Sequence, residues 1–390
     1  MRNEEYLLIP GPTPVVDSIY DALAEETRAH TDPRFVSRFK KAIERTKRIL
    51  NTDGEVILVA GSGTLVMEMA LVNAVAPGER VLVISHGHFG DRFTKLAQAF
   101  GFEFDVLQSE WGRQVSRDDL AQQLKKHTYK AVTVTHVDTS TGVKADLDDF
   151  IPLIKQHGAL AIVDGVCATT ALPEDMQYDY AGEGTSIDIV LTGSQKAIGA
   201  PPGVGIIAFS KKAVAARRAM ERVPAYYADI ENWIPIMEDP SKYFATPPVN
   251  MIYAVEEGLK IVEDEGLEQR YIRHEAYGKA VRAALRVYGM EPLADEGDAA
   301  PTLSCIRYPE GTDDASFRAA LAEKGIILAG ALAHLAGKAF RIGHMGNTTP
   351  EILESAIRKI GETLQEQGTE ADVEKAAEAF REEVGALQTK

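Results

Sequence analysis

The chain has 390 residues, with 42 Lys and Arg against 58 Asp and Glu, so its formal net charge is −16. Its length is typical of two domains rather than of one small core. The acidic balance disfavours a nucleic acid or an anionic membrane as a partner, because Lys and Arg make the phosphate contacts on which such binding depends. No apolar run approaches the roughly 18 residues of a membrane span, and the acidic start of the chain does not resemble a secretory signal, so we expect a cytoplasmic protein.

Seven short apolar runs, most of them rich in Val and Ile, alternate with amphipathic stretches in the first half of the chain. Because most runs are continuous rather than alternating, they are typical of strands buried on both faces of a sheet. Helical patterns such as Thr64–Val75 and Leu147–Gln156 separate them, which indicates a mostly parallel sheet. We therefore predict an α/β fold whose large domain holds a mostly parallel seven-stranded sheet flanked by helices. The seven runs are Val56–Ala60, Val81–Ile84, Phe104–Leu107, Ala131–Thr135, Leu160–Asp164, Ile187–Leu191 and Val204–Phe209.

The second half of the chain has a different pattern. Prolines and aromatic residues crowd the stretch 211–260, which predicts an irregular functional loop or an interface. A long helical pattern follows, and shorter strand-like and helix-like segments up to Gln367 predict a smaller C-terminal α/β domain. The tail from Thr369, rich in Ala, Glu and Lys, predicts a helix on the surface. We expect an N-terminal segment (1–20), a large cofactor-binding domain (21–262), a small domain (263–368) and a helical tail (369–390).

A Gly/Ser turn, Gly61-Ser62-Gly63-Thr64, lies between a predicted strand and a predicted helix. In such a turn, backbone N–H groups and the helix N-terminus can converge on an anion, most often a phosphate. The turn matches neither a Walker loop nor a G-x-G-x-x-G fingerprint. By itself it could equally be a tight connection without a ligand.

Two polar residues follow other strands of the predicted sheet. Asp164 ends one strand, and Lys196 comes just beyond the next. The carboxyl ends of strands in an open α/β sheet face the ligand crevice. Taken alone, Asp164 could cap the following turn and Lys196 could be an exposed loop residue. Together with the phosphate turn they are the parts that pyridoxal phosphate needs: a turn for its phosphate, an acid that keeps its ring nitrogen protonated, and a lysine for its aldehyde.

Over nearly its whole length the chain resembles the class V aminotransferases of the fold-type I pyridoxal-phosphate superfamily. The resemblance is closest to the alanine–glyoxylate and serine–pyruvate aminotransferase group, which includes sequences labelled as a soluble hydrogenase subunit. The most specific segment is Gly193–Gly203, with the sequence GSQKAIGAPPG. The supporting segments are Leu8–Pro14, His30–Phe35, Gly61–Thr64, Gly87–Arg92, Thr135–Val143, Val163–Asp164 and Arg341–Gly343.

The resemblance implies a role for each cofactor-binding position. Lys196 would form the Schiff base and later move the proton of the substrate, and Asp164 would pair with the ring nitrogen. Phe89, where many relatives have Trp, would stack on the ring. Ser140 would lie beside the ring and its phenolic oxygen. The phosphate would be bound by Ser62, Gly63, Thr64 and Gln195.

The resemblance also implies contacts from a second subunit and from the substrate. Tyr243 and Thr246 would reach the phosphate of the neighbouring subunit, so that a homodimer shares its active sites. Without the resemblance, a hydrophobic interface is the simpler interpretation of that stretch. Arg341 would bind the substrate carboxylate, for which a planar guanidinium is well suited, although an Arg that ends a short strand is usually in a surface ion pair. Gly11 would approach the same carboxylate through its backbone.

These features predict a pyridoxal-phosphate-dependent aminotransferase with a ping-pong cycle. The expected donor is a small amino acid, alanine or serine, and the expected acceptor is a small 2-oxo acid, glyoxylate or pyruvate. The same scaffold also supports lyases, desulfurases, and aminotransferases for ureidoglycine or aminoethylphosphonate. A non-catalytic partner subunit of a redox enzyme is a third interpretation. It predicts loss of the lysine or of the phosphate turn, and both are present.

Other chemically suggestive residues are not expected to form sites. His86-Gly87-His88 resembles a metal-binding pair, but the spacing suggests no third ligand, so we predict no metal site. Two cysteines, Cys167 and Cys305, are too few for a disulfide framework. We expect both to be small core residues rather than nucleophiles, which weakens the case for a desulfurase.

Overall fold

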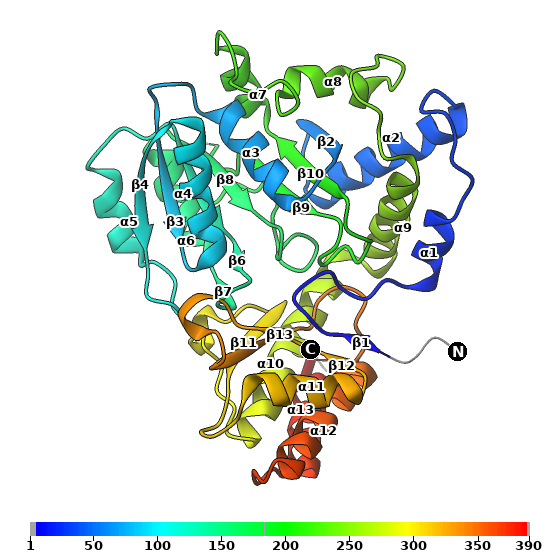
Figure 1. The fold of residues 1–390 in the computed structure, drawn as a ribbon. Coiled ribbons are helices and arrows are strands. Elements are labelled where there is room, and N and C mark those ends of the chain that lie inside the picture. The colour runs from blue at the N-terminus through cyan, green and yellow to red at the C-terminus, as the bar shows by residue number, and fades with distance from the viewer. Residues whose placement is uncertain (1–4, 183, 388–390) are drawn as a thin grey trace.

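A computed structural model describes residues 5–182 and 184–387. The apolar side chains form two large separate clusters, one around the main sheet and one among the C-terminal helices. These clusters correspond to the upper and lower bodies in Figure 1. No helix within the described ranges is long and apolar enough to span a membrane.

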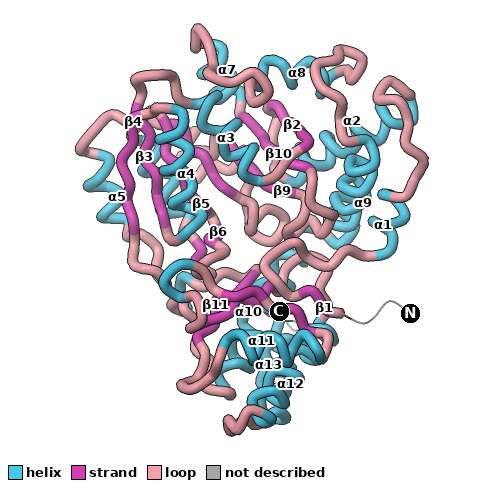
Figure 2. Tube along the Cα trace, in the orientation of Figure 1, coloured by secondary structure: helices cyan, strands magenta, loops and turns pink. Residues whose placement is uncertain are grey.

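The upper, large body is built on a seven-stranded sheet, whose strands lie side by side in Figure 2. The strand order is β2-β10-β9-β8-β5-β3-β4, and only β10 runs antiparallel to its neighbours. All seven predicted strands are present, so the prediction of a mostly parallel seven-stranded sheet is confirmed. The strands are β2 (Glu55–Ala60), β3 (Arg80–Ser85), β4 (Glu103–Gln108), β5 (Ala131–Thr135), β8 (Leu160–Asp164), β9 (Ile189–Gly193) and β10 (Val204–Phe209).

Burial explains the apolar character of these strands. Every residue of β5, β8, β9 and β10 is buried, as expected for strands covered on both faces. The strand β4 differs because it forms the edge of the sheet, and its Val106 is 39% exposed. Helices cover the sheet: α2 (Pro33–Ile49), α3 (Gly63–Ala74), α4 (His88–Phe100), α5 (Arg117–Leu124) and α6 (Leu147–Gln156). The smaller elements are α1 (Asp17–Leu23) and the hairpin of β6 (Val137–Asp138) and β7 (Val143–Lys144).

The stretch predicted to be irregular contains two helices, α7 (Lys211–Arg218) and α8 (Ile230–Glu238). The prediction was wrong here because it gave too much weight to the prolines. Pro235 lies inside α8, but that helix buries Trp233 and Ile236 in the main core, and this apolar burial outweighs the cost of one missing backbone hydrogen bond.

The lower, small body begins after α9 (Val249–Glu265) with the long helix α10 (Leu267–Val287). Its three-stranded antiparallel sheet has the order β11-β14-β13. The strand β1 (Tyr6–Leu7) pairs with β12 of this body, so the N-terminal part of the described chain is anchored to the small body. The remaining elements are β11 (Leu303–Arg307), α11 (Asp314–Glu323), β12 (Ile326–Ile327), β13 (Ala329–Gly330), β14 (Ala339–Gly343), α12 (Pro350–Glu366) and α13 (Val373–Leu387).

The C-terminal segment is helical, as predicted, but it is not a surface appendage. The helix α13 packs against α10 and α12, and the side chains of Ala376 and Phe380 are buried in the core of the small body. The composition of the segment did not reveal this, because Ala, Glu and Lys dominate it and large apolar residues such as Phe380 and Val384 are few.

Buried histidines are a notable feature of this fold. His86, at the end of β3, is fully buried, and neither of its ring nitrogens has a hydrogen-bond partner among residues 5–182 and 184–387. Burial therefore lowers its pKa from 6.5 to about 4. Burial also lowers the pKa of His344 to about 3. His86 is thus a neutral core residue rather than half of a metal pair.

We expect the free energy of unfolding to fall as the pH is lowered from about 6.5 to about 4, because the unfolded chain binds a proton on His86 and the folded chain does not. Above pH 6.5 both states hold a neutral imidazole, so this loss is absent. It amounts to about 1.4 kcal/mol per pH unit for each such histidine. Urea unfolding of His86→Leu should show a shallower pH dependence than the wild type. Equal slopes would mean that His86 does not carry this effect.

Candidate active site

A cavity lies at the carboxyl ends of β8 and β9, where parallel strands of an open sheet present their ligands. It brings together seven of the predicted residues, which come from four separate segments of the chain. These residues are Ser62, Gly63, Thr64, Phe89, Asp164, Gln195 and Lys196. The cavity is also lined by Met67, Arg92, Val137, Thr139, Val166 and Cys167.

The N-terminus of α3 forms one wall of the cavity. Ser62 is the N-cap residue, but its side chain makes no capping bond, and no partner in the described structure accepts the N–H groups of Gly63 and Thr64. The Arg92 guanidinium donates to Oγ1 of Thr64 at 3.0 Å and lies 4.7 Å from the centre of the Phe89 ring. Free N–H groups, a helix N-terminus and an arginine together form a site for an anion such as a phosphate.

Asp164 lies on the opposite side of the cavity, at the end of β8. It is buried, and its Oδ1 accepts the N–H of Val166 at 3.0 Å. Its pKa is raised from 3.8 to about 7, mainly by burial and also by the nearby carboxylates of Asp138 and Glu174, while the N–H of Val166 and the charge of Arg92 act in the opposite direction. No described residue donates to Oδ2. A buried carboxyl group with a free oxygen is suited to bind a protonated ring nitrogen.

Lys196 lies directly beyond β9, and its Nζ donates to the carbonyl of Pro10. Gly11 packs against the same side chain: a Cβ there would lie 2.4 Å from Cδ of Lys196. Its φ of +108° is also one that other residues rarely adopt. Gly11 was predicted to approach the substrate carboxylate, and the structure places it beside the lysine at the entrance to that region.

The backbone around Lys196 is held by segments from both bodies. Thr13 donates its N–H to the carbonyl of Gln195 at 3.0 Å and its hydroxyl to the carbonyl of Lys196 at 2.8 Å. The guanidinium of Arg270, on α10, donates to the carbonyl of Ala197 and to Glu265. Arg270 is only 1% exposed, so the small body contacts the lysine loop through a buried hydrogen bond from a guanidinium to a backbone carbonyl. The position of Lys196 is therefore set by contacts on three consecutive carbonyl groups.

Arg341 lies in the middle of β14 and faces the same region. Its Nε donates to the carbonyl of Gly330 at 2.9 Å, and its Nη1 lies 3.4 Å from the carbonyl of Thr139, which lines the cavity. Within the described ranges Arg341 forms no ion pair, so it is not the surface ion pair that such a position often holds. Burial lowers its pKa. A partly buried guanidinium without a carboxylate partner is available for a substrate carboxylate.

Ser140 does not line the cavity. Its hydroxyl donates to Oδ1 of Asp138 at 2.6 Å and accepts the N–H of His88 at 2.9 Å. Oδ2 of Asp138 accepts the N–H groups of Phe89 and Gly90 at the start of α4. The structure thus gives Ser140 and Asp138 a part in holding the helix that carries Phe89, and it is the neighbouring Thr139 that lines the cavity.

Tyr243 and Thr246 lie outside the cavity as well. Tyr243 is 62% exposed, its hydroxyl is 3.3 Å from Oγ1 of Thr246, and its ring centre is 5.4 Å from that of His30. Both residues lie on the surface of the chain that contains them, so the structure does not bring them to the other predicted residues.

The sequence reasoning missed six lining residues, and four of them are close neighbours of a predicted one. Val166 and Cys167 follow Asp164, Thr139 precedes Ser140, and Arg92 lies three residues after Phe89, on the same face of α4. Cys167 is buried, as predicted, but its thiol faces the cavity, with Sγ 3.5 Å from Oγ1 of Thr139. Burial raises the pKa of this thiol, which keeps it protonated.

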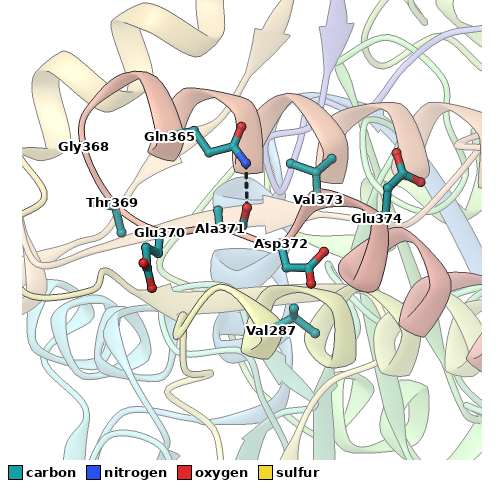
Figure 3. A pocket seen from close by; sticks show the side chains of 9 residues that line it. All are labelled: Val287, Gln365, Gly368, Thr369, Glu370, Ala371, Asp372, Val373 and Glu374. Atoms are coloured by element: carbon teal, nitrogen blue, oxygen red, sulfur yellow. Dashed lines mark hydrogen bonds between the residues drawn. The ribbon is translucent and has the colours of Figure 1, made fainter.

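A larger hollow, of about 890 Å³, lies on the small body between the end of α10 and the turn from α12 to α13 (Figure 3). Gln365 donates to the carbonyl of Ala371 there, at 2.7 Å. The charged side chains at the hollow are all acidic: Glu370, Asp372 and Glu374. The described residues that line it include neither a lysine nor a histidine, so the smaller cavity around Lys196 is the candidate active site.

Known proteins resemble the chain over nearly its whole length. The chain is 34% identical over 390 residues to the soluble hydrogenase 42 kDa subunit of Anabaena cylindrica, covering 97% of this chain and 100% of that protein. It is 32% identical over 379 residues to the serine–glyoxylate aminotransferase of Methylorubrum extorquens, covering 94% and 92% of the two chains. The crystal structure of ureidoglycine–glyoxylate aminotransferase from Bacillus subtilis matches with a TM-score of 0.92 at 26% identity and covers 97% of both chains.

A family model described as "Aminotransferase class-V" matches residues 6–339, which is most of the chain. The relatives cover nearly all of it, and the superposition includes both bodies. The chain belongs to the class V aminotransferase family.

Proposed function

We propose that this aminotransferase moves an amino group from alanine or serine to a small 2-oxo acid, glyoxylate or pyruvate, in a ping-pong cycle. One observation carries the proposal: an anion-binding helix end, a buried carboxyl group and a lysine line one cavity, with an unpaired arginine beside it. Glyoxylate is the favoured acceptor, since the serine–glyoxylate and the ureidoglycine–glyoxylate enzymes both carry it in their names.

The residues of the cavity fit pyridoxal phosphate, the cofactor on which this family depends. Ser62, Gly63, Thr64 and Gln195 would hold its phosphate, for which the unpartnered N–H groups of α3 are the supporting observation. Asp164 would bind the ring nitrogen and Phe89 would cover one ring face. Lys196 would hold its aldehyde, and when bound the cofactor would supply an electron sink for the substrate's α-carbon.

The protein's own groups would carry out the remaining steps. The Lys196 amine would leave the carbonyl of Pro10 and take the α-proton of the substrate as a general base. Arg341 would hold the substrate carboxylate, which fixes the α-carbon in reach of that amine. Thr139 and Cys167 would border the space for the substrate side chain, and both are small, in keeping with a small donor.

We also propose a homodimer in which Tyr243 and Thr246 complete the cavity of the neighbouring subunit. Their exposed position on the surface of this chain supports the proposal. So does the aromatic cluster next to them: Phe244 lies 5.2 Å from Tyr226 and 5.1 Å from Trp233, between ring centres, and Tyr226 is 76% exposed. Large exposed aromatic side chains are typical of subunit interfaces.

This proposal has two alternatives: a different amino donor, and a role without catalysis. The ureidoglycine–glyoxylate enzyme has nearly the same backbone, so ureidoglycine is the second candidate donor. One relative is named as a hydrogenase subunit, which suggests a non-catalytic role as a further alternative. Lys196, Asp164 and the free helix end are all present in the cavity, and this argues against that role.

We expect reduction with borohydride to fix pyridoxal phosphate on Lys196 in the wild-type protein, with the modified peptide identified by mass spectrometry. Lys196→Ala should retain its fold and lose both the covalent label and the visible absorption of the bound cofactor. The matched control is Lys212→Ala, which removes an exposed lysine of α7. A label that persists in Lys196→Ala would remove Lys196 from its proposed role.

Arg341→Ala should raise KM for every amino acid and oxo acid substrate about tenfold to a hundredfold, the range expected for the loss of a charged hydrogen bond. Arg341→Lys keeps the charge without the planar fork and should recover only part of this loss. Arg307→Ala, an exposed arginine on the adjacent strand β11, should behave like the wild type in steady-state kinetics. If only one substrate is affected, Arg341 does not bind the shared carboxylate.

Single amino acids added without an oxo acid should identify the donor. Alanine or serine should convert the absorption of the cofactor from its lysine-bound form to its aminated form, and glyoxylate should reverse the change. If only ureidoglycine converts the cofactor to its aminated form, ureidoglycine is the donor in place of alanine or serine. A spectrum that no amino acid changes would contradict transamination.

A further inference from the structure

A buried pair of side chains, outside the cavity, lies directly behind Asp164. Oε1 of Glu174 is 2.7 Å from Nδ1 of His136, and the two residues are 3% and 4% exposed. The hydroxyl of Thr169 donates to the other carboxylate oxygen of Glu174. A carboxylate this deeply buried is expensive to maintain without a partner, so the imidazole and the hydroxyl account for its presence.

Strand register and a tight turn bring this pair to Asp164. Thr135, the last residue of β5, lies opposite Asp164 on β8, and the N–H of His136 donates to the carbonyl of Asp164 at 3.0 Å. Glu174 packs against Gly165: a Cβ there would lie 2.4 and 2.6 Å from the two oxygens of Glu174. The carboxylate of Glu174 can approach the backbone next to Asp164 only because residue 165 is glycine.

The charges around Asp164 are unbalanced toward the negative. Asp138 and Glu174 are the carboxylates that face it and raise its pKa, and Arg92 is the cation that lowers it. Asp138 is already occupied by the four N–H and O–H groups that it accepts from Phe89, Gly90 and Ser140. Glu174 is held on the side away from the cavity, so its charge acts on Asp164 from behind.

We propose that Glu174, held by His136 and Thr169, is a positioning residue that strengthens the hold of Asp164 on the proton of the cofactor's ring nitrogen. This inference rests on the proposed function, because it requires pyridoxal phosphate with its ring nitrogen at Asp164. A negative charge behind Asp164 makes the potential in front of it more negative, and this favours a protonated ring nitrogen over a neutral one.

The experiment compares two ligands on the full-length apoprotein by equilibrium binding. One is pyridoxal phosphate, and the other is its analogue with carbon in place of the ring nitrogen, which keeps the aldehyde and phosphate but binds no proton. We expect the preference of the wild type for pyridoxal phosphate over the analogue to fall about tenfold in Glu174→Gln, the factor that corresponds to one pKa unit. A merely structural role would weaken both ligands equally and leave the preference unchanged.

Two controls isolate the charge of Glu174. Thr169→Val removes a hydrogen bond but keeps the carboxylate, and Glu310→Gln makes the same chemical change at an exposed position. Both should retain the wild-type preference. Glu174→Met, which fills a similar volume without charge, carries the same expectation as Glu174→Gln, so the result does not depend on the folding of one variant.

The outcomes separate this inference from the proposed function. A wild-type preference that survives in Glu174→Gln and Glu174→Met overturns the role of Glu174 and leaves the proposed function standing. A wild type that binds both ligands equally overturns the role of Glu174 as well, since Asp164 would then hold no proton of the ring. A wild type that binds neither ligand overturns the proposed function itself.

Discussion

The hydrogen bonds on the carbonyl groups of Gln195, Lys196 and Ala197 are the contacts on which the rest of the site depends. They join the N-terminal segment through Thr13 and the long helix α10 through Arg270 to one short loop of the large body. A lysine on a loop is ordinarily mobile, and a flexible amine is a poor general base because its distance from the substrate varies. Here each consecutive carbonyl has its own donor, so the backbone beneath the amine has little freedom.

This arrangement also explains why the two bodies belong to one site. Arg270 is buried at their junction, where Glu265 balances its charge and the carbonyl of Ala197 accepts one of its N–H groups, so losing that carbonyl would leave a buried N–H group without its partner. Arg341 comes from the small sheet, whereas Asp164 and the phosphate turn come from the large one. The chain must fold both bodies before the substrate carboxylate and the cofactor can lie side by side.

The site contains several positively charged side chains, although the net charge of the whole protein is negative. The chain carries a net charge of −16, yet Lys196 and Arg92 line the cavity together with a helix N-terminus, and Arg341 contacts the carbonyl of Thr139 beside it. Asp164 also lines this cavity, and the buried carboxyl groups of Asp138 and Glu174 are near enough to raise its pKa. Under the proposed function, the phosphate and the substrate carboxylate would meet positive charge, while the ring nitrogen would meet the carboxyl group of Asp164.

The sequence by itself determined the sheet and the residues at its carboxyl edge. Buried parallel strands need continuous apolar runs, and Asp164 and Lys196 stood out because each interrupts or follows such a run. The sequence did not determine which distant segments of the chain come into contact. The exposure of Tyr243, the engagement of Ser140 with Asp138, and the pair of His136 and Glu174 depend on strand register and on the path of turns. Only the tertiary structure decided these, because a side chain's partner across 38 positions is set by packing and leaves no periodic trace in the chain.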